Sequence, residues 1–183
     1  SSDLGNPQQV QSALAAGAAG VQVGTAFSLC DESGLRDDLK KRLLQKVMNE
    51  DASVFTSPLA SPTGFPFKVA QLEGTLSEPE AYSQRNRICD LGFLRILYKR
   101  ENGTIGYRCA AEPVADCVKK GGAIEDTENC SCLCNNLSAT AGFAQIRKDG
   151  YVEQPILTSG DDLVAVGQFL KEGKTSYSAR DVI

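Results

Sequence analysis

Cysteine residues are the side chains of this sequence whose type and spacing could do chemistry. Cys130, Cys132 and Cys134 form a C-x-C-x-C run, and Cys109 and Cys117 precede it. Thiolates bind zinc, and these side chains could complete a tetrahedral site. Zinc ribbons favour C-x2–4-C pairs, however, and residues one position apart point to opposite sides of an extended chain. The spacing therefore favours buried thiols, and we predict no metal site.

The side chains that are absent exclude a larger class of chemistry. The sequence of 183 residues contains no histidine. Imidazole is the usual general base and a common metal ligand, so this chain by itself holds no Ser-His triad and no histidine base or ligand. Its seven cysteines come with no export signal. Reduced thiols and a cytoplasmic location are therefore expected.

Composition and charge are those of an ordinary globular domain. The sequence is 42% hydrophobic and 23% charged, with a net charge of −4. A nucleic-acid-binding protein would need a strong cationic face, and a membrane span would need about 20 consecutive apolar residues. The basic run Lys40-Lys41-Arg42 is followed by acidic residues and is expected on the solvated side of a helix. We expect neither nucleic acid nor a membrane as a partner.

Hydrophobic periodicity gives the order of elements in the first part of the chain. Residues 6–17 are predicted to be a helix, residues 20–24 a short buried strand, and residues 35–49 a second helix. A helix, a strand and a further helix alternate as in an α/β unit. Only the first 50 residues show this alternation.

The remaining two-thirds of the sequence is predicted to be irregular. Pro58, Pro62 and Pro66 interrupt any helix and favour loops. The Asn102-Gly103 pair between two β-prone runs predicts a hairpin. Ser159 or Asp161 is expected to cap a last helix that ends near Glu172.

One segment resembles a known family. Residues 15–27, AAGAAGVQVGTAF, are similar to the nitronate monooxygenase (2-nitropropane dioxygenase-like) family of FMN-dependent barrels. Further segments extend the resemblance over nearly the whole chain: CDESGL (30–35), SPTGFPFKV (61–69), CDLGFLR (89–95), GTIGYRC (103–109), CLCNNLSATAG (132–142) and DGYVEQPILTSGDDL (149–163). Together they resemble the C-terminal portion of the long bacterial members.

The resemblance implies a fold and a division into domains. The family has a (β/α)8 barrel that holds FMN, and a complete barrel takes about 250 residues. The expected fold class is therefore α/β, as a C-terminal fragment of an FMN-binding TIM barrel with a mostly irregular α+β cap. Residues 1–50 would supply helix seven, strand eight and helix eight, and residues 51–183 the cap.

The resemblance also implies which residues hold FMN. It places the phosphate at Gly24, where a bare backbone allows close approach, and at Thr25, which offers a hydroxyl donor. Gly5 is a further candidate, although the adjacent Ser2-Asp3 replaces the usual glycine pair. A small, polar stretch resembles a part of the family that approaches the flavin, with candidate contacts Asn135, Ala141, Gly142 and Gln145.

The expected activity is that of an oxidoreductase that oxidises alkyl nitronates with oxygen. Its histidine base would lie upstream of this chain, so no catalytic residue is assigned, and the isolated chain is expected to be inactive. An FMN-dependent enoyl reductase of the same barrel class is the alternative. A non-catalytic remnant or partner-binding module is another, in which the chain binds an N-terminal barrel portion or associates with itself.

Overall fold

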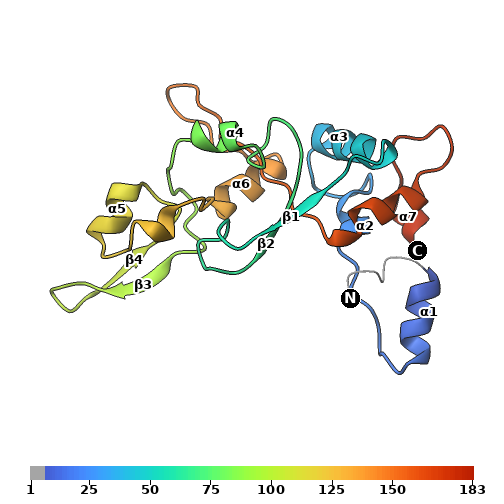
Figure 1. The fold of residues 1–183 in the computed structure, drawn as a ribbon, viewed down its shortest axis with the longest axis horizontal. Coiled ribbons are helices and arrows are strands. Elements are labelled where there is room, and N and C mark those ends of the chain that lie inside the picture. Colours follow the sequence, from blue (N-terminus) through green and yellow to red (C-terminus); the bar gives the residue numbers. More distant parts are fainter. Residues whose placement is uncertain (1–6) are drawn as a thin grey trace. The chain divides into compact units, whose positions relative to one another are not determined.

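The computed structural model describes residues 7–183, which divide into two compact units. Unit 1 holds the chain up to Phe55, Ala70–Leu72 and Thr158–Ile183, and unit 2 holds Thr56–Val69 and Glu73–Leu157 (Figure 1). Residues 158–183, which the sequence analysis groups with the cap, therefore belong to the same unit as the expected barrel portion. Each unit is described by itself below.

Unit 1 is helical. Its elements are α1 (Pro7–Ala15), α2 (Thr25–Ser28), α3 (Asp37–Met48), the 3-10 helix η2 (Asp161–Phe169) and α7 (Ala179–Val182). The apolar face of α3, formed by Leu39, Leu43, Leu44 and Val47, is buried as the periodicity predicts. It packs against η2, where Gly167 allows close approach, because a Cβ there would lie 3.3 Å from Val47 Cγ1.

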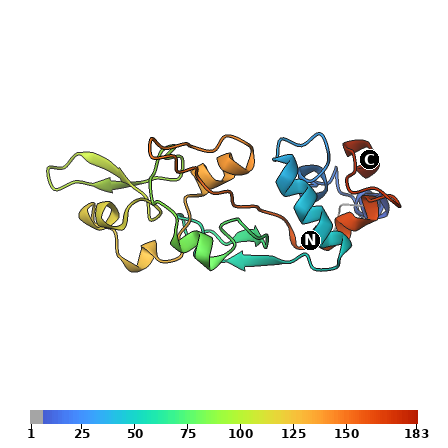
Figure 2. The ribbon, with the colours of Figure 1, turned by 90° about the horizontal axis from the view of Figure 1, so that it is seen from above.

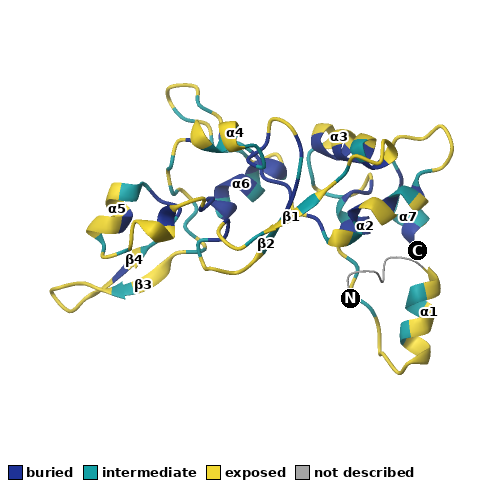
Figure 3. Ribbon diagram, viewed as in Figure 1, coloured by how far each residue is buried: buried dark blue, intermediate teal, exposed yellow. Residues whose placement is uncertain are grey.

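In contrast, α1 has no buried residue (Figure 3). Its leucine, Leu14, is 48% exposed. The segment that follows it, residues 17–24, is exposed or half-buried throughout. An isolated helix of nine residues is marginal in water, because helical stability in proteins comes mostly from packing.

Unit 2 is built from short elements and loops. They are α4 (Pro79–Ser83), β3 (Ile96–Lys99), β4 (Ile105–Arg108), α5 (Val114–Lys119), the 3-10 turn η1 (Glu125–Thr127) and α6 (Leu133–Thr140). A further two-stranded sheet pairs β1 (Val54–Ser57) with β2 (Phe67–Ala70). An apolar cluster in the unit comprises Ala60, Val69, Leu76, Leu133 and Ile156.

The predicted hairpin is confirmed. Strands β3 and β4 are antiparallel, with Leu97 opposite Tyr107 and Lys99 opposite Ile105. Gly103 has a φ of +79°, which a residue with a side chain rarely adopts. Beside the hairpin lies α5, as Figures 1 and 2 both show.

Three predictions about elements are wrong. Residues 20–24 form no strand, because an extended segment needs a neighbour to take its hydrogen bonds and none of the described residues pairs with it. The last helix is a 3-10 helix that ends at Phe169. It begins after Gly160, and no side chain caps it, so neither Ser159 nor Asp161 has the expected role.

The fold class is therefore mixed α/β with two small two-stranded sheets. Residues 7–183 contain no closed barrel. No helix within the part of the chain that the structure describes is long and apolar enough to cross a membrane.

Candidate functional site

The Gly24-Thr25 turn lies where the exposed segment enters α2. Gly24 is exposed, with a φ of −105° and a ψ of −68°, and no other atom lies within 4 Å of the position a Cβ would take. A ligand can therefore approach the main chain at Gly24. Helix α2 begins at the next residue, Thr25, which is buried.

The Thr25 side chain is engaged inside unit 1. Its hydroxyl donates a hydrogen bond to Asp162 Oδ1 at 2.7 Å and accepts one from the Gly160 amide at 3.0 Å. The carbonyl of Ala26 accepts the hydroxyl of Tyr177 at 2.6 Å, and burial raises the pKa of Tyr177. These bonds fix α2 to the start of η2 and to the segment before α7.

Lys40 holds the loop that follows α2. It is 4% exposed, which corrects the prediction that the whole basic run is solvated. Its ammonium donates to the carbonyls of Cys30 at 3.1 Å, Asp31 at 3.0 Å and Ser33 at 3.2 Å, and it lies 3.2 Å from Asp37 Oδ1. The signal for this role was present, since Lys40 lies three positions before Leu43 on the buried face of α3.

The second group of candidates is the set of expected flavin contacts, Asn135, Ala141, Gly142 and Gln145. Asn135 is fully buried in unit 2. Its amide nitrogen donates to Asp90 Oδ2 at 2.7 Å, to the Ile88 carbonyl at 3.1 Å and to Glu153 Oε2 at 3.2 Å. Its carbonyl oxygen accepts the Leu91 amide at 3.4 Å. The side chain has therefore no free donor or acceptor group for a ligand.

The other candidates of that group lie at and beyond the end of α6. Ala141 is the C-terminal cap, and Gly142, with a φ of +86°, turns the chain away. Gln145 donates its amide to the Phe143 carbonyl at 3.1 Å, while its Oε1 is buried without a hydrogen-bond partner. Gln145 Oε1 is thus the acceptor in this group that remains open to a donor.

An ionic network, buried at Arg85 and Glu153 and partly exposed at Asp90 and Arg147, surrounds Asn135, and the sequence analysis missed it. Arg85 and Glu153 form a bidentate pair, with Nε to Oε1 at 2.9 Å and Nη2 to Oε2 at 3.0 Å. Asn136 donates to Glu153 Oε1 at 3.0 Å, and Arg147 donates to Asp90 Oδ2 at 2.6 Å. The hydrogen bonds from Arg147 hold the pKa of the Asp90 carboxyl below its usual value. No spacing rule identifies this network, because its members are far apart in the chain.

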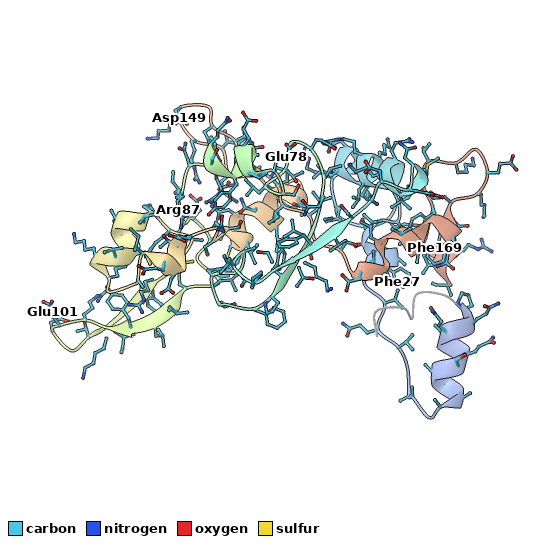
Figure 4. All side chains as sticks on the ribbon, in the orientation of Figure 1. Phe27, Glu78, Arg87, Glu101, Asp149 and Phe169 are labelled. Carbon is cyan, nitrogen blue, oxygen red and sulfur yellow. The ribbon has the colours of Figure 1, made fainter. Side chains whose placement is uncertain are left out.

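A second arginine, Arg87, joins several loops of unit 2 (Figure 4). It donates to the carbonyls of Ala110 at 2.5 Å, Thr127 at 3.1 Å and Glu112 at 3.2 Å. The guanidinium of Arg87 therefore uses its donors for main-chain carbonyls of these loops. We assign it the role of stabilising the loops and not of binding a ligand.

The cysteines of unit 2 form a small core. Cys109, Cys130 and Cys132 are buried together, and half-buried Cys134 packs against them. Burial raises the pKa of Cys130 to about 12 and that of Cys132 to about 11. No group of three or more cysteine or acidic side chains in residues 7–183 is arranged to hold a metal ion. These thiols therefore behave as small apolar side chains.

The candidate residues of the two groups belong to different units. Gly24 and Thr25 lie in unit 1, and Asn135, Ala141, Gly142 and Gln145 lie in unit 2. Gly5 lies outside the described residues.

Comparison with known proteins finds one partial match. Residues 4–65 match the family model for nitronate monooxygenase. The resemblance seen in the sequence is therefore confirmed over that stretch, which contains α1, α2, α3 and the Gly24-Thr25 turn. No curated protein matches the chain. No solved structure matches it.

Proposed function

We propose that this chain is part of an FMN-dependent oxidoreductase of the nitronate monooxygenase type. The observation that carries the proposal is that the family match and an unburied segment fall on the same stretch of the chain. The family match spans residues 4–65, and within it the segment from α1 to Gly24 has the sequence of a helix and a strand, but none of its described residues is buried. A barrel portion would cover both.

The phosphate of FMN would be held by the main chain at Gly24. The exposed backbone there leaves room for an anion. The Thr25 hydroxyl does not suit the same role, because its proton points to Asp162, and that carboxylate would repel a phosphate. The backbone of the turn would therefore make the phosphate contact, and the Thr25 side chain would support the turn.

The second group of candidates fits the flavin less completely. The Asn135 side chain is fully used within unit 2, so a direct contact would have to come from Gln145 or from the backbone at Ala141 and Gly142. Gln145 Oε1 could accept a ring N–H. Bound FMN would supply the redox chemistry, taking electrons from the nitronate substrate and passing them to oxygen. The residues of this chain would bind the cofactor and exclude water.

A titration of the purified chain with FMN, followed by visible absorbance, tests the cofactor site. We expect a saturable change in the flavin spectrum that the Gly24→Ala variant weakens at least about tenfold, since a Cβ would stand between backbone and phosphate. Gly34→Ala is the matched control, because that glycine has equal space around it and no positive φ. Equal affinity of the two variants would refute the Gly24 site.

Helix α1, in which no residue is buried, also favours the alternative of a partner-binding module. Val10 is half-buried and Leu14 exposed on this helix. We expect the chain to associate with itself or with a barrel portion through this helix. Light scattering at high concentration should show association that Leu14→Gln abolishes and that Phe143→Gln, a change at another exposed apolar side chain, leaves intact. A clean monomer would exclude self-association.

A further inference from the structure

A cavity of about 560 Å³ opens between the end of the β3–β4 hairpin and the C-terminal end of α5. It lies within unit 2 and is separate from every residue assigned to FMN above. Its volume is in the range of sites for small molecules, which is roughly 300–1,000 Å³. The residues that line it determine which ligand it would bind.

Four cationic residues line this cavity: Lys99 and Arg100 from the hairpin, Lys119 at the end of α5, and Lys120, which follows it. One carboxylate, Glu101, lines it as well, at the tip of the hairpin (Figure 4). The whole chain has 23 acidic and 19 basic residues. The cavity therefore concentrates positive charge in a protein whose overall charge is negative.

Most of this positive charge is not neutralised within the protein. Lys120 is paired with the buried Glu112, its Nζ lying 2.6 Å from Oε2. The Arg100 guanidinium donates to the Thr104 hydroxyl at 3.3 Å. Among residues 7–183, no carboxylate lies within ion-pair distance of Lys99, Arg100 or Lys119. With Glu101 counted, the cavity retains two positive charges for a ligand.

Both walls of the cavity are fixed in place. In the hairpin turn, Asn102 Oδ1 accepts the Thr104 amide at 3.1 Å and the Gly103 amide bonds to the Arg100 carbonyl at 2.9 Å. The end of α5 is tied to β4, since Arg108 Nη1 donates to the Lys120 carbonyl at 2.9 Å. The main chain that carries these cationic residues is therefore fixed before any ligand arrives, which reduces the entropy lost on binding.

We infer that this cavity binds the diphosphate group of a small phosphorylated molecule. Two uncompensated charges match a polyanion, and ammonium and guanidinium groups are the usual partners of phosphate oxygens. The Tyr98 side chain also lines the cavity, and its hydroxyl has no hydrogen-bond partner among the described residues, so it can donate to a phosphate oxygen. The cavity is larger than one phosphate needs, and it is too local for the extended basic stripe of a nucleic-acid surface.

The test is a calorimetric titration of the full chain with pyrophosphate, ADP and orthophosphate at low ionic strength. We expect pyrophosphate and ADP to bind, and the double variant Lys99→Gln, Lys119→Gln to weaken both by at least about tenfold. The double variant Lys148→Gln, Lys174→Gln removes the same charge at exposed positions that do not line the cavity and should bind as the unaltered chain does. Equal loss in the two variants would overturn the proposal.

Amide chemical shifts locate the bound anion. Pyrophosphate should shift the amides of residues 98–102 and 118–121 and leave Gly24 unchanged. Shifts confined to Gly24 would assign the binding to the proposed FMN turn and overturn this inference, whereas failure of FMN to bind would leave it standing. Orthophosphate binding as tightly as pyrophosphate, or a single-stranded oligonucleotide binding more tightly than either, would also overturn it.

Discussion

Arg85 and Glu153 form an ion pair whose side chains are 2% and 0% exposed, although 68 residues separate them in the chain. Both Glu153 oxygens accept from the guanidinium, and both also accept from the amides of Asn135 or Asn136. Two buried charges are costly unless such bonds replace water. This pair therefore holds together the segments that surround α6.

Removing one partner of this pair should be strongly destabilising. We expect Arg85→Ala to lower the free energy of unfolding by about 3–5 kcal/mol, because the buried Glu153 would lose its bidentate partner and keep only Arg147, 3.9 Å away, as a countercharge. Arg36→Ala, which breaks an exposed pair with Asp38, should cost less than about 1 kcal/mol. Urea unfolding followed by circular dichroism measures both, and a cost for Arg85→Ala no larger than that of Arg36→Ala would contradict this role of the pair.

Lys40 should be worth more to stability than its exposed neighbour. Lys40→Met removes the donor shared by the carbonyls of Cys30, Asp31 and Ser33, and we expect a loss of about 1–3 kcal/mol. Lys41→Met, at an exposed position of the same helix, should change stability by less than about 0.5 kcal/mol. Thermal unfolding of the two variants provides the comparison, and equal melting temperatures would rule out a structural role for the buried ammonium.

Asp90 should make stability depend on pH in the acid range. Arg147 lowers the pKa of Asp90 in the folded protein below its ordinary value of 3.8, so unfolded chains bind the proton more tightly. The stabilisation is complete above that value and is lost as pH falls through the folded-state pKa. We expect Asp90→Asn to be less stable than the unaltered chain at pH 6, with the difference shrinking below about pH 4.

The control for this pH dependence is Arg147→Gln, which removes the partner that lowers the pKa. Its stability should approach that of Asp90→Asn in the same pH window. A constant difference between the unaltered chain and Asp90→Asn from pH 6 to pH 2 would show that the carboxyl does not titrate as the structure implies.

The buried thiols should resist alkylation in the folded chain. With a pKa of about 12, the Cys130 thiol is ionised in only about one molecule in ten thousand at pH 8, and the thiolate is the reactive form. We expect Cys130 and Cys132 to remain unmodified by iodoacetamide under conditions that modify them fully in urea. Mass spectrometry of the digested protein measures the extent of alkylation at each cysteine. Rapid modification of Cys130 and Cys132 without urea would mean that this core opens in the folded chain.

Local sequence was sufficient for the elements whose formation depends on neighbours in the chain. The apolar spacing of Leu39, Leu43 and Val47 predicted α3, and Asn102-Gly103 predicted the hairpin. In both, the determining interactions lie within a few residues. The same reasoning failed for residues 20–24, because a β-prone run becomes a strand only where another segment takes its hydrogen bonds.

The sequence by itself determined that this chain has no imidazole chemistry and that residues 4–65 resemble the nitronate monooxygenase family, and it predicted the Gly24-Thr25 turn as a place to look for a phosphate. Only the tertiary structure decided what the candidate side chains bond to. The Thr25 hydroxyl is taken by Asp162, which is 137 residues away, and the Asn135 amide by Asp90 and Glu153. Hydrogen bonds between distant segments form through folding of the whole chain, and no local pattern encodes them.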